Sequence, residues 1–408
     1  MKNIKFITIS IISILLFTVI LPSTISTSKA TLINSDNDGL NNLSEMKINL
    51  LMKIGRIPSL SVCFIKNDSI IFYKGLGYAN RAEKKIPNKD TVYKVASITK
   101  SVTATAMMQI IENESYGVDI DDDINDYLNF SVRNPNHPDI PITFRMLMAH
   151  QASFYPNSEL AQMGTKYMGD LLRSTFPVFN KYDYPYPYIK EYLKSSDRWL
   201  DIEPGKEAYY GNTAYVLLEH LIERITDKSY EDYCQENIFV PLKMKNTSFE
   251  TNELGENTAT YYVSLMLLPF PYYRSTITGA AGLTTSIEDL SHYLIAHMNN
   301  GTYDGVRILK NETVELMHSK QFPDSIGQIL GYYFGLGWEI YPEDWIWNGM
   351  VLQGHAGSTI GGGGEMLWNE SSDLGIIAFM NRKMSRLSTL LIWCYDQIIT
   401  ELLKNIEI

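Results

Sequence analysis

Three short segments of the sequence carry side chains that together could attack an ester or an amide. The first is Ser97-Ile98-Thr99-Lys100, at the start of a stretch with helical spacing of apolar residues. Lys100 lies about one helical turn after Ser97 and on the same face, so its amine can reach the serine hydroxyl. A lysine there can accept or relay the hydroxyl proton, and backbone N–H groups at a helix N-terminus can stabilise an oxyanion. The pair therefore has the chemistry of an activated nucleophile.

The S-x-x-K spacing alone is a weak signal, because it occurs at Ser26–Lys29, Ser44–Lys47 and Ser97–Lys100. An isolated match is most often a helix-capping serine beside a solvated lysine. The third pair differs, because the apolar stripe that includes Ala104, extended back by four and seven residues, reaches Lys100 and Ser97. We therefore expect both of these side chains to face the packed side of their helix.

The second segment is Tyr210-Gly211-Asn212. Residues two apart point the same way in an extended stretch, so we expect Tyr210 and Asn212 to face one pocket. A tyrosine near a lysine ammonium could act as a general base below its usual pKa of about 10. Asn212 could hydrogen-bond a substrate amide and the lysine. The alternative is a tyrosine and an asparagine in an ordinary loop.

The third segment, His355-Ala356-Gly357-Ser358, ends a predicted strand whose edge could pair with an extended substrate. In that arrangement Gly357 leaves room for the substrate backbone, and His355 offers a donor or a positive charge to a substrate carboxylate. The backbone N–H groups of Ser358 and Ser97 would form an oxyanion hole. The alternative is a strand-end histidine before a glycine-rich turn.

The order serine–lysine, Tyr-x-Asn, His-x-Gly resembles the serine β-lactamase and penicillin-binding-protein superfamily. The Tyr-x-Asn form resembles the branch that groups class C β-lactamases with D-alanyl-D-alanine carboxypeptidases and related esterases and amidases. The resemblance covers the chain from about Met46 to the C-terminus. Five further segments also fit that branch: residues 93–100, 142–150, 204–205, 279–285 and 335–338.

This resemblance implies a role for each residue of the three segments. Ser97 would be the acylated nucleophile and Lys100 its activating partner. Tyr210 would be the general base, which protonates the leaving group in acylation and activates water in deacylation. Asn212 would orient the substrate, and His355 with Gly357 would form the third element.

One departure from the pattern bears on substrate. Class C β-lactamases carry Lys-Thr-Gly where this chain carries His355-Ala356-Gly357. The loss of the lysine and the threonine argues against efficient β-lactam hydrolysis.

The elements that must position these residues are strands near both termini with helices between them. Expected strands cover residues 59–65, 69–73, 350–355, 365–368 and 374–380. Expected helices cover residues 40–52, 97–112, 142–148, 215–225, 287–297 and 387–404. We predict an α+β fold in which residues 31–115 and 275–408 build one antiparallel sheet with flanking helices and residues 116–274 form a helical insertion. The resemblance implies five strands.

The first 30 residues have the features of a signal peptide. Lys2 and Lys5 precede the apolar stretch Phe6–Leu21, and Ser28-Lys29-Ala30 offers small residues to a signal peptidase. We predict cleavage after Ala30 and a secreted or otherwise extracytoplasmic domain at residues 31–408. The alternative is an uncleaved membrane anchor, because the stretch is slightly long for a signal and slightly short for a span.

Composition narrows the partners. The 408 residues carry a formal net charge of −11, which argues against a nucleic-acid binder. The three cysteines are far apart, so neither a CxxC metal or redox site nor a complete disulfide framework is expected. We expect no cofactor, no metal, a small-molecule or peptide substrate, and a monomer.

The sequence thus predicts a secreted serine hydrolase that forms an acyl-enzyme on an amide or an ester. Carboxypeptidase activity on D-alanyl-D-alanine, or penicillin binding, is the central expectation. An esterase, an amidase or peptidase for D-amino-acid substrates, and a class C-like β-lactamase are alternatives. A non-catalytic binding module is a further alternative, but binding alone would not require Ser97, Lys100, Tyr210, Asn212 and His355 together.

Overall fold

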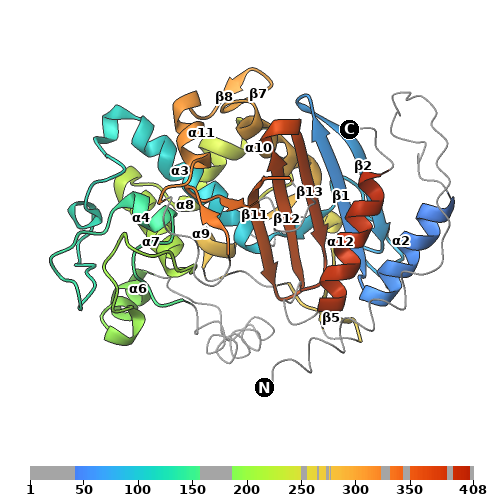
Figure 1. Ribbon diagram of the computed structural model, residues 1–408, viewed down its shortest axis with the longest axis horizontal. Helices are drawn as coiled ribbons and strands as arrows, with labels where there is room; N and C mark the ends of the chain where they lie inside the picture. The colour runs from blue at the N-terminus through green and yellow to red at the C-terminus, as the bar shows by residue number, and fades with distance from the viewer. Residues whose placement is uncertain are drawn as a thin grey trace. The chain divides into compact units, whose positions relative to one another are not determined.

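One antiparallel sheet, built from segments near both ends of the chain, forms the centre of the described structure (Figure 1). The computed structural model describes residues 42–156, 186–249, 255–263, 266–272, 275, 277–322, 331–342, 350–383 and 389–404. The strand order is β2-β1-β13-β12-β11-β10-β9. These strands are β1 (Ser59–Lys66), β2 (Ser69–Gly77), β9 (Tyr333–Phe334), β10 (Glu339–Tyr341), β11 (Leu352–Thr359), β12 (Gly362–Asn369) and β13 (Leu374–Met380).

The fold class is confirmed, but the predicted count of five strands is wrong for this sheet, which has seven. The five long strands are those expected from the sequence. β9 and β10 extend the sheet beyond β11 with two and three residues. Strands this short carry no readable alternation of apolar and polar residues, so the sequence pattern could not predict them.

The β1–β2 hairpin shows how local sequence fixes register. Asn67 and Asp68 both adopt positive φ, at 50° and 59°, which is the conformation of a type I′ turn. Lys66 therefore pairs with Ser69. This turn joins the first two of the strands expected from the sequence.

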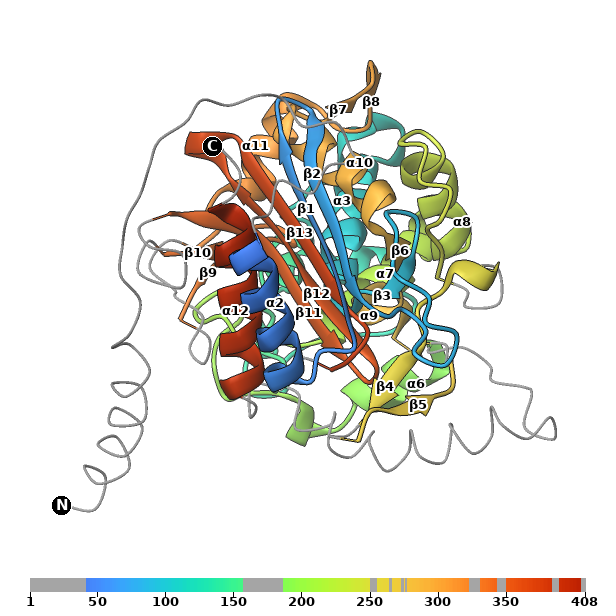
Figure 2. The same ribbon diagram turned by 90° about the vertical axis from the view of Figure 1, so that its right-hand side faces the viewer.

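Helices cover both faces of the sheet (Figure 2). α2 (Asn42–Gly55) and α12 (Thr389–Leu403) lie side by side on one face, where Leu60, Val62 and Phe64 of β1 join their apolar core. The alternate residues Cys63 and Ile65 join the other core, with α3 (Thr99–Glu112) and α10 (Ile287–Met298). Because β1 is buried on both faces, its central residues 62–65 form a continuous apolar run.

Helices dominate the segments between the N-terminal and C-terminal strands. Besides α3 and α10, they include α4 (Phe144–Met148), α6 (Tyr186–Leu193), α7 (Thr213–Thr226), α8 (Tyr230–Cys234) and α11 (Asn311–His318). The short hairpin β4 (Tyr261–Val263) and β5 (Leu268–Phe270) lies among them. The boundaries of the predicted insertion stay a prediction.

Two short elements place the nucleophile segment. β3 (Val92–Lys94) pairs with β6 (Thr284–Ser286) and leads directly into the nucleophile segment. α9 (Thr278–Ala281) lies just before β6. β6 runs into α10, where the Ser286 side chain accepts the N–H of Asp289 and caps the helix.

The predicted signal peptide, residues 1–30, lies outside the described residues. None of the helices in the described ranges is both long enough and apolar enough to cross a membrane.

Candidate active site

Ser97 lies in a tight turn between β3 and α3. Residues Ala96–Ile98 form one turn of 3-10 helix, and Ala96 adopts the left-handed φ of 50°. That conformation is unfavourable for a residue with a Cβ by about 1 kcal/mol, so the surroundings must hold it. The Thr99 hydroxyl does so, because it donates to the Ala96 carbonyl at 2.5 Å and accepts the Leu283 N–H at 3.0 Å. Ser97 remains partly exposed at the surface of this turn.

Lys100 is fully buried, which confirms the helical phase read from the sequence. Its Nζ lies 3.2 Å from Ser97 Oγ, 2.8 Å from Asn212 Oδ1 and 2.9 Å from the Ala280 carbonyl oxygen. A neutral amine can donate to the two carbonyl oxygens and direct its lone pair at the serine hydroxyl. Ser97 and Lys100 are therefore not a helix-capping serine beside a solvated lysine.

Burial lowers the pKa of Lys100 to about 7, and the nearby charge of Glu339 opposes that shift. Removing an ammonium from water disfavours its charged form, which is why the direction is downward. A lysine with this pKa is available as a proton acceptor near neutral pH.

Tyr210 and Asn212 reach Lys100 from the start of α7, as expected. Asn212 precedes the first residue of α7 and contacts the amine with its side-chain carbonyl. The centre of the Tyr210 ring lies 5.0 Å from Lys100 Nζ, and the Tyr215 ring centre lies 5.5 Å away. The structure therefore brings the second segment to the first.

His150 is a residue of this site that the sequence analysis did not single out. Its Nδ1 accepts the Gly211 N–H at 3.3 Å, and its ring centre lies 4.6 Å from that of Tyr210. Burial, then the charges of Lys100 and His355, hold the pKa of His150 well below its usual range. This neutral imidazole supports the Tyr210 segment from behind. The resemblance of residues 142–150 to the superfamily was the signal that could have identified it.

Gly357 brings β11 against the nucleophile turn. A Cβ on Gly357 would lie 2.0 Å from the Val95 carbonyl oxygen and 3.1 Å from the Ser97 nitrogen. The protein's own backbone therefore excludes a side chain at residue 357. This differs from the expectation that Gly357 leaves room for the backbone of a substrate.

Ser358 follows on the exposed end of β11. The Ala356 N–H donates to Glu339, on the side of β11 away from β12. N–H groups alternate along a strand, so the Ser358 N–H leaves β11 on that same side. Its pairing with the Ser97 N–H as an oxyanion hole stays a prediction.

His355 differs from the expectation in one respect. It is 1% exposed, and its Nδ1 lies 2.7 Å from the Ala356 carbonyl oxygen, which can only accept. Burial lowers the pKa of His355, although Glu339 acts in the opposite direction. Burial thus acts against the positive charge expected at His355, and its expected role as a donor or a charge for a substrate carboxylate stays a prediction. Its ring centre lies 6.1 Å from that of Tyr210, so His355 lies beneath the site.

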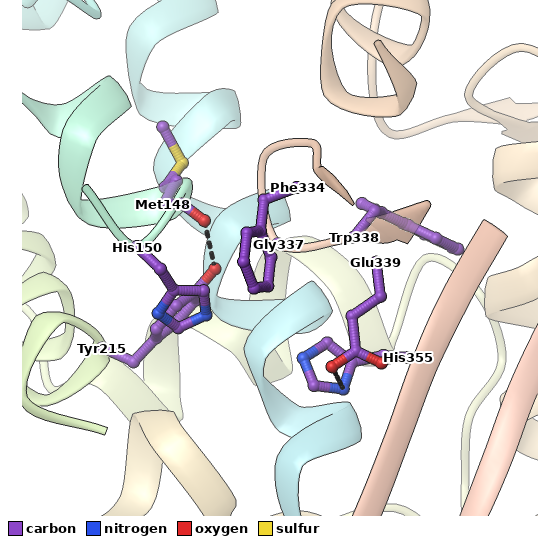
Figure 3. A pocket seen from close by; sticks show the side chains of 8 residues that line it. All are labelled: Met148, His150, Tyr215, Phe334, Gly337, Trp338, Glu339 and His355. Atoms are coloured by element: carbon purple, nitrogen blue, oxygen red, sulfur yellow. Dashed lines mark hydrogen bonds and ion pairs between the residues drawn. The ribbon is translucent and has the colours of Figure 1, made fainter. Parts of the chain in front are cut away.

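A narrow pocket lies beside these groups and contains the second residue that the sequence analysis missed, Glu339. Figure 3 shows His150 and Tyr215 on one side of this pocket, Glu339 and His355 on the other, and Phe334 between them. Its remaining lining residues are Met148, Gly337 and Trp338. No group of three or more metal-ligating side chains occurs among the residues that the structure describes.

Known proteins share this sequence pattern. The Beta-lactamase family matches residues 47–389. Protein flp of Staphylococcus aureus strain N315 is 25% identical over 331 residues, which cover 80% of this chain and 60% of flp. This chain thus spans less than two thirds of the length of that curated relative.

Solved structures share the fold. The octameric penicillin-binding protein homologue from Pyrococcus abyssi is 25% identical, with a TM-score of 0.70 over 88% of this chain and 77% of that chain. The D-amino acid amidase from Ochrobactrum anthropi SV3 is 19% identical, with a TM-score of 0.68 over 89% and 98%. The Beta-Lactamase/D-Alanine Carboxypeptidase from Pseudomonas syringae is 18% identical, with a TM-score of 0.67 over 90% and 99%. The chain therefore belongs to the Beta-lactamase family, a family of serine hydrolases.

Proposed function

We propose that this protein is a serine hydrolase that cleaves an amide or an ester through an acyl-enzyme on Ser97. The observation that carries the proposal is the buried Lys100 amine, 3.2 Å from Ser97 Oγ. In acylation, Oγ attacks the substrate carbonyl carbon while its proton moves to the neutral Lys100 amine. The N–H groups of Ser97 and Ser358 would stabilise the oxyanion.

Tyr210 and Asn212 complete the proposed cycle. Tyr210 would pass a proton to the leaving group and then activate the water that hydrolyses the acyl-enzyme. Asn212 holds the Lys100 amine at 2.8 Å and would also orient the acyl group. His150, which accepts the Gly211 N–H between these two residues, would keep them in place.

The first candidate substrate is a peptide ending in D-alanyl-D-alanine, or a penicillin that mimics it. Family membership and the three-segment pattern support this class. The second candidate is an uncharged ester, or an amide of a D-amino acid. The burial of His355 supports the second candidate, since it disfavours the positive charge that would bind a substrate carboxylate. A class C-like β-lactamase is the least favoured, because the Lys-Thr-Gly element is missing.

Covalent labelling tests the proposal. Wild type, Ser97→Ala and Ser44→Ala are incubated with a fluorophosphonate and with a fluorescent penicillin. We expect an adduct in wild type and Ser44→Ala and none in Ser97→Ala. Absence of any Ser97-dependent adduct would reject a serine hydrolase and favour a binding module. Labelling by the fluorophosphonate alone would favour the ester or amide class, which p-nitrophenyl esters, nitrocefin and D- and L-aminoacyl amides would then resolve.

We also propose that the domain works outside the cytoplasmic membrane. The basic start, the apolar stretch Phe6–Leu21 and the small residues before Thr31 support this. N-terminal sequencing of the exported protein is expected to begin at Thr31. An N-terminus that is still intact on a membrane-bound protein would support the anchor instead.

A further inference from the structure

Glu339 is a buried acidic side chain next to the proposed machinery. Its side chain is 4% exposed. Oε1 accepts the Tyr332 hydroxyl at 2.6 Å, and Oε2 accepts the Tyr341 hydroxyl and the Ala356 N–H, the latter at 3.2 Å. A carboxyl group that only accepts hydrogen bonds has the pattern of the ionised form. Two tyrosine hydroxyls and one backbone N–H thus hold this carboxylate inside the protein, and His355 Nδ1 lies 3.9 Å from Oε1.

One of these contacts ties Glu339 to β11. β10 pairs with β11 only as far as Gly354. The Ala356 N–H lies two residues further along this edge of β11, where β10 offers no backbone partner. The Glu339 carboxylate accepts its hydrogen bond instead. The next N–H on this edge belongs to Ser358, the proposed oxyanion donor.

The electrostatic effect of Glu339 reaches Lys100. Gly337, two residues earlier, packs so closely on α3 that a Cβ there would lie 3.0 Å from the Lys100 carbonyl oxygen. The negative charge of Glu339 favours the protonated form of Lys100, against the effect of burial. When Lys100 takes the Ser97 proton, it becomes a buried cation that needs such a counter-charge.

We propose, on the basis of the proposed function, that Glu339 is a positioning residue for acylation. Its carboxylate anchors the edge of β11 through the Ala356 N–H. The same charge stabilises Lys100 at the moment when the Ser97 proton arrives. Glu339 exchanges no proton with the substrate.

Other titratable groups surround this pair and must be separated from Glu339 in any test. They come from the segment after α4, from α7 and the residues just before it, from the residue before β9, from β10, and from β11 and β12. These groups are His150, Tyr210, Tyr215, Tyr332, Tyr341, His355 and Glu365.

A lysine titration tests the inference without requiring turnover. The protein is labelled with ¹³C at lysine Cε, and the Lys100 signal is assigned by its loss in Lys100→Met. In Glu339→Gln we expect the Lys100 midpoint to fall by about 1 pH unit from its wild-type value. Glu339→Asp keeps the charge but shortens the side chain, so its midpoint should stay close to wild type.

Glu365→Gln is the matched control. Glu365 is a buried carboxyl on β12, and it is bonded to Tyr395 of α12 at 3.0 Å. Its substitution should leave the Lys100 midpoint in place. If Glu339→Gln leaves that midpoint unchanged, or if Glu365→Gln moves it equally, the inference is wrong.

Acylation then links the inference to the reaction. The rate of Ser97 labelling by fluorophosphonate is measured against pH in wild type and in the three Glu variants, Glu339→Gln, Glu339→Asp and Glu365→Gln. Glu339→Gln should shift the acidic limb downward with the lysine midpoint and lower the plateau about tenfold. A lowered plateau with an unshifted limb would mean a structural role only and would overturn the inference. If wild type forms no adduct, the proposed function fails, while the titration still decides the charge effect of Glu339.

Discussion

The chain contains the same Ser-x-x-Lys spacing on two described helices, and the two pairs have opposite environments. In α2, the Ser44 hydroxyl donates to Glu401 Oε1 at 2.8 Å, and Lys47 Nζ lies 2.5 Å from Glu401 Oε2. The Lys47 side chain is 42% exposed. In α3, the fully buried Lys100 amine contacts the hydroxyl of its own serine, an amide oxygen and a backbone carbonyl.

The contrast shows that the Ser-x-x-Lys spacing only brings the lysine amine close to the serine. The burial and the partners of the lysine decide whether its amine can accept a proton. Lys47 and Ser44 share a carboxylate, and although burial acts the other way, their bonds hold the pKa of Glu401 below its ordinary value. That arrangement is an ion pair between α2 and α12. Lys100 contacts neutral groups, and burial brings its pKa to about 7. Only the second lysine is poised to accept a proton.

The largest expected effect separates the two lysines by activity. Lys100→Ala removes the proton acceptor and should slow acylation of Ser97 about a thousandfold. Lys47→Ala should change the rate less than about twofold, since its partner lies on α12. Rapid-quench mass spectrometry of the fluorophosphonate adduct measures both rates. Equal losses in the two variants would remove the distinction between the pairs.

Asn212→Ala should have the next largest effect. It removes the 2.8 Å contact that orients the Lys100 amine, and a hydrogen bond to a charged or reacting group is worth about 1.5–3 kcal/mol, or roughly 10- to 100-fold in rate. Ser44→Ala is the control, because it removes a buried serine and its hydrogen bond to Glu401 of α12. An unchanged acylation rate in Asn212→Ala would exclude the orienting role.

Replacement of Lys100 should raise the stability of the fold, although it lowers the rate of acylation. The pKa of Lys100 is about 7 in the fold and near its ordinary 10.5 when unfolded, so the unfolded chain binds the extra proton between these values. The free energy of unfolding should therefore rise with pH across that window. Lys100→Met should remove this slope and raise the free energy of unfolding at pH 7 by about 1–3 kcal/mol. Urea unfolding at several pH values measures it, and an unchanged slope would contradict the buried neutral amine.

The smallest effect concerns the surface pair. Lys47→Met breaks the contact with Glu401 and should lower the free energy of unfolding by less than about 1 kcal/mol. High salt should weaken the same contact in wild type. A loss of several kcal/mol would show that the α2–α12 ion pair is more than a surface contact.

Local sequence patterns predicted the parts of the site that depend on local structure. Helical phase placed Lys100 on the buried side, and the Asn67-Asp68 turn set the register of β1 with β2. These features depend on neighbours within one helical turn or one hairpin, so the sequence alone contains their cause.

Features that depend on distant contacts were not predictable from pattern. Glu339 has its role because Ala356, 17 residues away, and two tyrosines donate to it. His150 acts through Gly211, 61 residues away. His355 is buried within β11, and its neighbours along the sequence do not reveal that burial. Each of these depends on tertiary packing.

The most direct test of the central claim is the pH dependence of Ser97 acylation in wild type. We expect a fluorophosphonate adduct on Ser97 whose rate of formation rises tenfold per pH unit below about pH 7 and is level above it, as Lys100 loses its proton. A rate that keeps rising toward pH 10, or an adduct on another serine such as Ser44, would contradict it.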